Sequence, residues 1–287
     1  MSDFGRRLQI LITGAFIALS SSCGFDPALT LPSVSIDVEG TERSYNIFVP
    51  TNTSTSSPLL LAFHGGGGAG FEFPQQREFE NLASEQGFIL ALPQAVRVGG
   101  NEGEWQLNTT QERYQDIQYV RKVIEDISNN HNVNERKIYA VGYSLGSMFT
   151  YELACQMNSE FAAIASFAGT MPVNMESCAQ SRNVPIMHIH GTDDGIISYQ
   201  DSWNWKSWSE VGPMRNIPDL LAFWSTKSGC GDEQQSTEGT VNHQVYTDCA
   251  GDGRFEHYRL EGQGHGWPEK IDSQITADAI WGFLSRF

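Results

Sequence analysis

The chain has 287 residues, of which 40% are hydrophobic and 18% are charged, a composition typical of a folded globular protein rather than a disordered one. Its length allows one sizeable core and is short for two ordinary enzyme domains. The formal net charge of −16 at pH 7 argues against a nucleic-acid partner, because binding phosphates requires clustered lysines and arginines.

The N-terminal segment 1–23 is typical of an export signal. Arg6 and Arg7 precede a mostly apolar run over residues 8–19, and small residues follow it. The run is short for a membrane span, so we expect a signal that is cleaved. The small residues before Cys23 resemble a bacterial lipoprotein signal, in which this cysteine carries the lipid, although a serine stands where such signals usually have a leucine. A lipid anchor on Cys23 and ordinary secretion both remain open.

Four cysteines follow this segment, and an even number in an exported chain suggests two disulfides. Of the three possible pairings we favour the one that closes the two short loops, Cys155 with Cys178 and Cys230 with Cys249. None of these cysteines has the close paired spacing of a zinc site, so no metal is expected.

Strands and helices are expected to alternate along the rest of the chain. Early strands are expected at 33–39 and 44–49, and continuous apolar runs predict buried strands at 59–63, 88–92, 137–143, 162–167 and 185–189. Helices are expected around 117–127, at 145–157 and at 271–284. This alternation predicts an α/β fold, in which helices cover both faces of a mainly parallel sheet, in a single domain over residues 24–287.

The pentapeptide Gly142-Tyr143-Ser144-Leu145-Gly146 lies where a buried strand is expected to meet a helix. A serine on such a turn is held in a strained conformation with its hydroxyl exposed, and the flanking glycines let the backbone pass closely. Ser144 is therefore the candidate nucleophile. The N–H of Leu145, at the start of the helix, is a candidate donor to a developing oxyanion.

A nucleophilic serine needs a base and an orienting acid, and α/β-hydrolases carry them in the chain order Ser, acid, His. His265 lies in a glycine-rich loop before the last predicted helix and is the candidate base. Asp193 and Asp194 both follow the predicted strand at 185–189, and residue chemistry alone does not choose between them. Two further histidines on that strand could bind a metal, but no carboxylate partner is evident and a structural role is the preferred interpretation.

A second glycine-rich stretch, His64-Gly65-Gly66-Gly67, follows the predicted strand at 59–63. Gly65, Gly66 and Gly67 can turn backbone N–H groups toward an oxyanion because no side chain is in the way. The stretch also fits a dinucleotide-binding glycine pattern. The next predicted strand, however, is followed by Gln94 instead of the acidic residue that binds ribose, so no nucleotide cofactor is expected.

Together these motifs resemble the secreted α/β-hydrolases that include feruloyl esterases and poly(3-hydroxybutyrate) depolymerases, from about residue 43 to the C-terminus. The resemblance implies an α/β-hydrolase fold with no large separate cap domain, and a serine esterase that needs no cofactor. In that family the acid is the second residue after the threonine of a His-Gly-Thr motif, which falls on Asp194. The pairing of Cys155 with Cys178 is also similar to the family's arrangement.

Aromatic residues near the predicted catalytic loops are candidate substrate contacts: Trp105, Tyr143, Trp203 and Trp267. Such rings can stack on a feruloyl group or a sugar, or lie on a polyester surface, but filling the core is as good an interpretation for each of them. The expected partner is thus an ester from a plant polymer or a polyester, with membrane contact only through a lipid on Cys23. An acyltransferase on the same scaffold and a catalytically silent binding protein at the cell surface are the alternatives.

Overall fold

The computed structural model describes residues 31–53, 55–67, 73–98, 102–107, 115–175, 178, 181–204 and 211–287. The predicted export signal, including Cys23, lies outside these residues and stays a prediction. No helix of the described part is long and apolar enough to cross a membrane.

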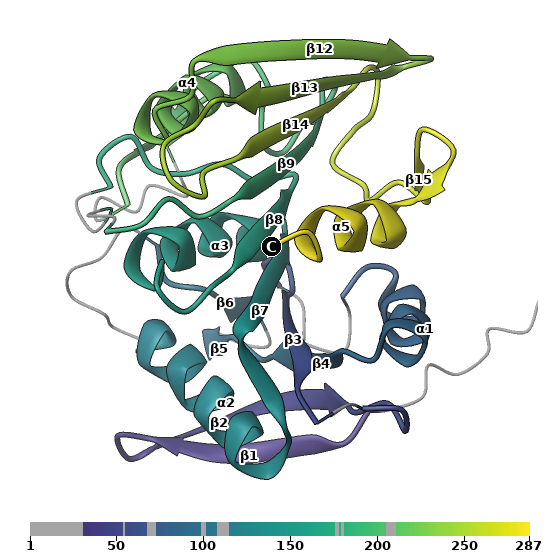
Figure 1. Cartoon of the computed structure of the whole chain (residues 1–287). Helices are drawn as coiled ribbons and strands as arrows, with labels where there is room; N and C mark the ends of the chain where they lie inside the picture. Colours follow the sequence, from purple (N-terminus) through teal and green to yellow (C-terminus); the bar gives the residue numbers. More distant parts are fainter. Residues whose placement is uncertain are drawn as a thin grey trace, which may run out of the picture.

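Ten strands form the main sheet. These strands are β1 (Ser33–Val38), β2 (Thr41–Phe48), β3 (Ser57–Phe63), β4 (Ile89–Pro93), β7 (Val133–Tyr143), β8 (Ala163–Phe167), β9 (Ile186–Gly191), β12 (Asp232–Glu238), β13 (Val241–Thr247) and β14 (Phe255–Leu260). Their order is β1-β2-β4-β3-β7-β8-β9-β14-β13-β12 (Figure 1). The six strands from β4 to β14 are parallel, and antiparallel pairs extend the sheet at both ends. The predicted mainly parallel sheet is confirmed.

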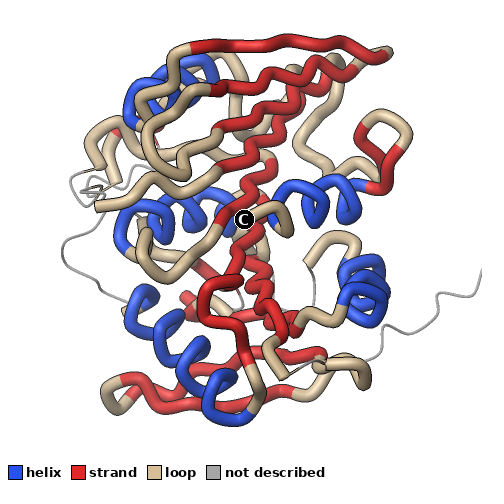
Figure 2. Tube along the Cα trace, viewed as in Figure 1, coloured by secondary structure: helices blue, strands red, loops and turns tan. Residues whose placement is uncertain are grey.

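Helices lie on both sides of this sheet (Figure 2). They are α1 (Gln76–Gln86), α2 (Asp116–Asn130), α3 (Leu145–Gln156), α4 (Ile217–Lys227) and α5 (Thr276–Leu284). Helices α1 and α5 cover one face, and α2, α3 and α4 cover the other (Figure 1). Short two-stranded pairs lie beside the sheet: β5 (Val96–Val98) with β6 (Glu102–Glu104), β10 (Trp203–Asn204) with β11 (Pro213–Met214), and β15 (Lys270–Ile271) with β16 (Gln274–Ile275).

Strand β3 shows why the central strands are apolar throughout. Successive side chains of a strand point to opposite faces. Leu59, Leu61 and Phe63 belong to the core under α2 and α3, whereas Leu60 and Ala62 belong to the core under α1 and α5. All five are fully buried, because helices cover both faces of the sheet.

Two parts of the fold differ from the elements expected from the sequence. Helix α5 begins at Thr276 rather than at residue 271, because residues 270–275 form the β15–β16 hairpin, with Asp272 at a positive φ of 54°. Helices α1 and α4 and strands β12, β13 and β14 lie outside the predicted elements. All seven residues of β12 are exposed, so this strand lacks the apolar pattern that predicts a strand.

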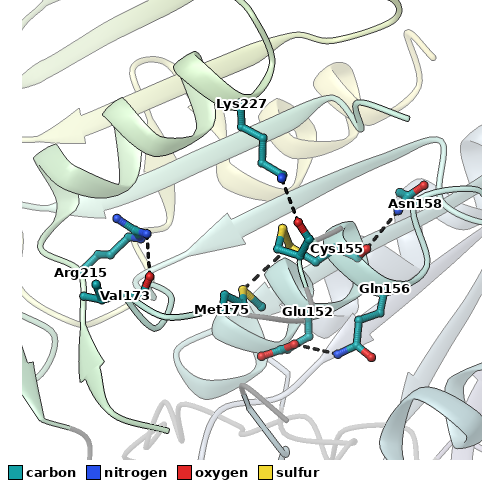
Figure 3. The surroundings of a disulfide bond; sticks show 9 residues. Glu152, Cys155, Gln156, Asn158, Val173, Met175, Arg215 and Lys227 are labelled. Atoms are coloured by element: carbon teal, nitrogen blue, oxygen red, sulfur yellow. Dashed lines mark hydrogen bonds between the residues drawn. A yellow bond between two sulfur atoms is a disulfide. The ribbon is translucent and has the colours of Figure 1, made fainter. Parts of the chain in front are cut away.

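Both favoured disulfides are present. Cys155, near the end of α3, is bonded to Cys178, and Cys230 is bonded to Cys249. Figure 3 shows that Lys227 of α4 also holds the segment at Cys178, since its ammonium donates to the Cys178 carbonyl at 2.9 Å. Helix α3 follows Ser144 directly, so the first disulfide anchors the far end of the helix that begins after this candidate nucleophile.

Replacing Cys155 and Cys178 together by alanine is expected to lower the free energy of unfolding by about 3 kcal/mol. The bond spans 23 positions of sequence and restricts the unfolded chain accordingly. Urea unfolding followed by circular dichroism measures the loss. The matched control is the double replacement of Cys230 and Cys249, which span 19 positions and should lose a similar amount. An unchanged urea midpoint in the first double variant would contradict the prediction.

Candidate active site

Ser144 lies on the sharp turn between β7 and α3. Its backbone has φ 53° and ψ −119°, a conformation that residues with a side chain rarely adopt. A Cβ atom at Gly142 would lie 2.2 Å from the Gly146 carbonyl oxygen, and one at Gly146 would lie 2.1 Å from the Phe63 carbonyl oxygen. Only glycines fit at these two positions, and their close packing holds the serine in its strained turn.

Three side chains meet at the carboxyl edge of the parallel strands. Ser144 follows β7, Asp194 follows β9 and His265 follows β14. His265 Nε2 lies 2.9 Å from Ser144 Oγ, and His265 Nδ1 lies 2.7 Å from Asp194 Oδ2. These distances form one hydrogen-bonded row from hydroxyl to imidazole to carboxylate.

The loop that carries Asp194, the candidate acid, packs closely against the loop that carries His265, the candidate base. A Cβ atom at Gly191 would lie 2.1 Å from the Gln263 carbonyl oxygen, and that same oxygen accepts the Asp193 N–H at 3.0 Å. The Asp193 side chain is exposed, and its carboxylate accepts only a 3.3 Å bond from Thr192 Oγ1 among the bonds of the described part. These backbone contacts between the two loops place the Asp194 side chain at His265 and leave the Asp193 side chain exposed to solvent.

The Asp194 carboxylate is buried, and several protein groups donate hydrogen bonds to it. Its Oδ1 accepts the backbone N–H groups of Ile196 and Ile197, both at 2.8 Å. Burial raises the pKa of this carboxyl, but the hydrogen bonds from His190, His265 and these two amides outweigh it and hold the pKa well below its ordinary value. Asp194 is thus ionised at the neutral pH at which enzymes are ordinarily assayed.

His190 is a contact of the acid that the sequence motifs left unassigned. Its ring is fully buried, with Nε2 2.9 Å from the Ile197 carbonyl oxygen and 3.3 Å from Asp194 Oδ2. Two acceptors face this nitrogen, so it carries the proton and donates. The spacing of four residues between His190 and Asp194 is the signal that would have found it. His188 is also buried, and its Nδ1 lies 2.7 Å from the hydroxyl of Tyr151.

The glycine loop after β3 is set by His64. The N–H of Ala95 donates to His64 Nε2 at 3.1 Å, so the ring proton lies on Nδ1, which donates to the Gly65 carbonyl at 2.8 Å. A trans peptide directs its C=O and N–H to opposite sides. The N–H of Gly66 therefore points away from the His64 ring.

Gly65 and Gly66 lie directly against the nucleophile turn. A Cβ atom at Gly65 would lie 3.3 Å from the Ser144 Cβ, and one at Gly66 would lie 3.4 Å from the Leu145 side chain. The structure thus brings two of the three candidate oxyanion glycines to Ser144. Gly67 has a φ of 77°, as a tight glycine turn requires.

Of the aromatic residues predicted as candidate substrate contacts, some lie in the core and some lie beside the site. The prediction for Trp105 is wrong. Trp105 is fully buried, stacks on Phe149 with ring centroids 4.9 Å apart, and donates its indole N–H to the His64 carbonyl at 3.0 Å. It supports the glycine loop from within the core and has no surface to offer a substrate. Trp203 is half-buried on β10 and packs against the core under α2, α3 and α4.

Tyr143 and Trp267 lie beside the base. The Tyr143 hydroxyl donates to the His265 carbonyl at 3.1 Å, and its ring lies 5.5 Å from the His265 ring. Trp267 is half-buried, 6.0 Å from Tyr143 between ring centroids. Two further tryptophans of the segment after Trp203 lie outside the described residues. Among the described residues, no group of three or more His, Cys, Asp or Glu side chains could hold a metal ion.

A parallel sheet with helices on both faces, and a strained serine in a row with a histidine and a buried aspartate, define the α/β-hydrolase class. The sequence profile described as phospholipase/carboxylesterase matches residues 49–208, more than half of the chain. The protein belongs to this phospholipase/carboxylesterase family of α/β-hydrolases.

Similar proteins include an acetylxylan esterase and feruloyl esterases. The chain is 28% identical over 251 residues to a bifunctional acetylxylan esterase/xylanase of Neocallimastix patriciarum, a match that covers 87% of this chain and 34% of the relative. It is 26% identical over 237 residues to feruloyl esterase B of Piromyces equi, covering 81% and 42%. The solved acetyl xylan esterase from Aspergillus awamori has the same fold, with a TM-score of 0.67 at 17% identity, covering 88% of this chain and 99% of that one.

The chain spans less than half the length of the first curated relatives it matches. The predicted resemblance to feruloyl esterases is confirmed. Its extension to poly(3-hydroxybutyrate) depolymerases stays a prediction.

Proposed function

We propose that the protein is an exported serine esterase that hydrolyses carboxylic esters with Ser144 as nucleophile, His265 as base and Asp194 as orienting acid. The observation that carries the proposal is the hydrogen-bonded row in which His265 Nε2 lies 2.9 Å from Ser144 Oγ and His265 Nδ1 lies 2.7 Å from Asp194. A binding protein has no need for this arrangement on a strained turn.

Acylation begins when Ser144 Oγ attacks the ester carbonyl carbon and its proton moves to His265 Nε2. The N–H groups of Gly66 and Leu145 stabilise the negative oxygen of the tetrahedral intermediate. The carbon–oxygen bond to the alcohol then breaks, and His265 gives its proton to the leaving alkoxide. An acyl-enzyme and a free alcohol result.

Deacylation repeats these steps with water. His265 takes a proton from water as the water oxygen attacks the acyl carbon, and the second tetrahedral intermediate collapses as His265 returns the proton to Ser144 Oγ. The carboxylic acid leaves. The Asp194 carboxylate stabilises the imidazolium that forms in both half-reactions and keeps Nε2 directed at the serine.

Feruloyl or acetyl esters of plant polysaccharides are the substrate class we favour, because the relatives are named for these esters. The rings of Tyr143 and Trp267 beside His265 provide an aromatic wall on which a feruloyl group can stack. A polyester of 3-hydroxybutyrate is the second substrate to test, since it stays a prediction from the sequence motifs.

The test measures product release from methyl ferulate, acetylated xylan and poly(3-hydroxybutyrate) side by side. Each assay includes the Ser144→Ala variant and an alcohol acceptor, so that acyl transfer is detected separately from hydrolysis. Release from one of these esters that is lost in the variant supports the proposal and identifies the acyl group. If none is cleaved and short-chain esters also fail, the esterase proposal is wrong.

Export is part of the proposal, because two disulfides persist best in an oxidising compartment. Whether Cys23 carries a lipid is tested by labelling cells with a radioactive fatty acid. Label on the wild-type protein that disappears in a Cys23→Ser variant indicates a lipoprotein. An exported protein without label indicates ordinary secretion.

A further inference from the structure

Gln75, which directly precedes α1, holds an unusual backbone conformation. Its φ of 51° and ψ of 35° lie in the left-handed region, where a residue with a side chain is strained. Such a conformation persists only where the surroundings determine it, and strained residues often serve a functional site. Gln75 contributes no side-chain cap to its own helix. Its side-chain amide bonds instead to residues outside α1.

The Gln75 amide makes three hydrogen bonds to the C-terminal part of the chain. Gln75 Nε2 donates to the Glu269 carbonyl at 2.8 Å. Its Oε1 accepts the indole N–H of Trp267 at 3.1 Å and the backbone N–H of Ala277 at 3.2 Å. One side chain thus joins the start of α1 to the loop that carries His265 and to the start of α5.

Helix α5 depends on this contact because it has no cap of its own. The residue at its N-cap position, Ile275, makes no side-chain hydrogen bond. Helix N-termini leave backbone N–H groups that need acceptors from outside the helix. Gln75 supplies the acceptor for Ala277, and the Glu269 carbonyl that Gln75 holds also accepts the Thr276 N–H at 3.0 Å.

The Trp267 ring links the Gln75 contact to His265, which lies two residues earlier in the chain. Its centroid lies 5.5 Å from that of Phe73, on the α1 side, and 4.7 Å from that of Phe167, at the end of β8. The hydroxyl of Tyr143 donates to the His265 carbonyl. His265 is therefore held both by the residue that precedes Ser144 and by the loop that Gln75 contacts through Trp267.

We propose that Gln75 is a positioning residue for His265: its amide fixes Trp267, Glu269 and the first turn of α5, and thereby the angle at which the imidazole meets Ser144. The proposal rests on the proposed esterase function. Small displacements of a catalytic group lower the rate of the chemical step, because the reacting atoms must approach within a narrow range of distance and angle.

The test compares three variants. Gln75→Met keeps the length and volume of the side chain and removes all three hydrogen bonds. Gln75→Glu keeps the acceptor for Trp267 and Ala277 and places negative charge at a helix N-terminus, where it is favourable, but it replaces the donor to the Glu269 carbonyl by a second acceptor. Gln76→Met is the matched control, since the Gln76 amide bonds within α1 to Glu80 at 2.7 Å.

Three quantities are measured well below the unfolding temperature of each variant. They are kcat and KM with a short soluble ester, and the rate at which a fluorophosphonate inactivates Ser144, which needs the base but no ester substrate. Gln75→Met is expected to lower kcat and the inactivation rate by about tenfold with KM changed less than about twofold. Gln75→Glu should recover part of both losses, and Gln76→Met should match the wild type.

Three results would overturn the inference. If Gln75→Met and Gln75→Glu lower only the unfolding temperature, with kcat and the inactivation rate unchanged, Gln75 is structural and the esterase proposal stands. If the wild-type protein neither cleaves esters nor reacts with the fluorophosphonate, the esterase proposal itself fails and the inference fails with it. A loss confined to KM also overturns the inference, because a misplaced base acts on the chemical step.

Discussion

Replacing Ser144 by alanine is expected to lower kcat for ester hydrolysis by about 10⁵- to 10⁶-fold. The variant keeps the oxyanion donors and the binding surface but has no oxygen that can form the acyl-enzyme. His265 then has only a distant water to activate, in place of a hydroxyl 2.9 Å away. The measurement is steady-state hydrolysis of a nitrophenyl ester, together with the pre-steady-state burst that reports acyl-enzyme formation.

Ser147→Ala is the matched control for this variant. Ser147 lies one turn further along α3, is fully buried, and its hydroxyl bonds to that of Ser166 at 2.5 Å. Its loss should cost about 1 kcal/mol of stability and leave kcat within a few-fold of the wild type. A Ser144→Ala variant that keeps its burst, or a Ser147→Ala variant that loses it, would place the nucleophile elsewhere.

The site residues predictable from the sequence are those whose role is decided locally. Gly142 and Gly146 are separated from Ser144 by one residue on each side, and the same turn that needs them also exposes the hydroxyl. His265 has a comparable local signal in its glycine-rich loop. All parallel strands except β14 were predictable for the same reason, since burial on both faces leaves a continuous apolar run such as that of β3.

Roles that depend on contacts between distant segments were not predictable. Trp105 is a core residue because of two distant partners. Its ring stacks on Phe149, 44 positions away, and its N–H donates to the His64 carbonyl, 41 positions away. Nothing in the residues around it separates that role from a substrate contact. Gln75 shows the same limit more strongly, because its three partners lie near the other end of the chain.

The choice between Asp193 and Asp194 was only partly predictable from the sequence. The residues alone left it open, and only the resemblance to a family favoured Asp194. In the structure the choice follows from turn geometry, because the amides of Ile196 and Ile197 both donate to Asp194 Oδ1 and fix its carboxylate toward His265. A turn of this kind has no sequence signal that distinguishes two adjacent aspartates.

Replacing Asp194 by asparagine is expected to lower kcat by about 10⁴-fold at neutral pH. The wild-type carboxylate accepts on both oxygens, from two backbone amides on one and from His265 Nδ1 on the other. An asparagine has a single oxygen. If that oxygen keeps the two amides, the NH₂ group faces His265 Nδ1, and the ring must take the tautomer with its proton on Nε2. That proton then faces Ser144 Oγ, and the base cannot accept the serine proton.

The matched variant is Asp193→Asn, which removes the same charge one residue away. Its side chain is exposed and is not bonded to His265 among the described contacts, so kcat should stay within about twofold of the wild type. If Asp193→Asn is the more damaging of the two, the acid has been assigned to the wrong residue.

The pH dependence of stability tests the role of Asp194 by a measurement that needs no substrate. The pKa of Asp194 is held below its ordinary value of 3.8, so its ionised form stabilises the fold above that pH, and this stability is lost as the pH falls through and below it. Asp194→Asn should therefore be less stable than the wild type at pH 7, with a difference that narrows toward pH 3. Urea unfolding of the two proteins at both pH values measures it, and a difference that stays constant would mean that the carboxylate gains nothing from its four donors.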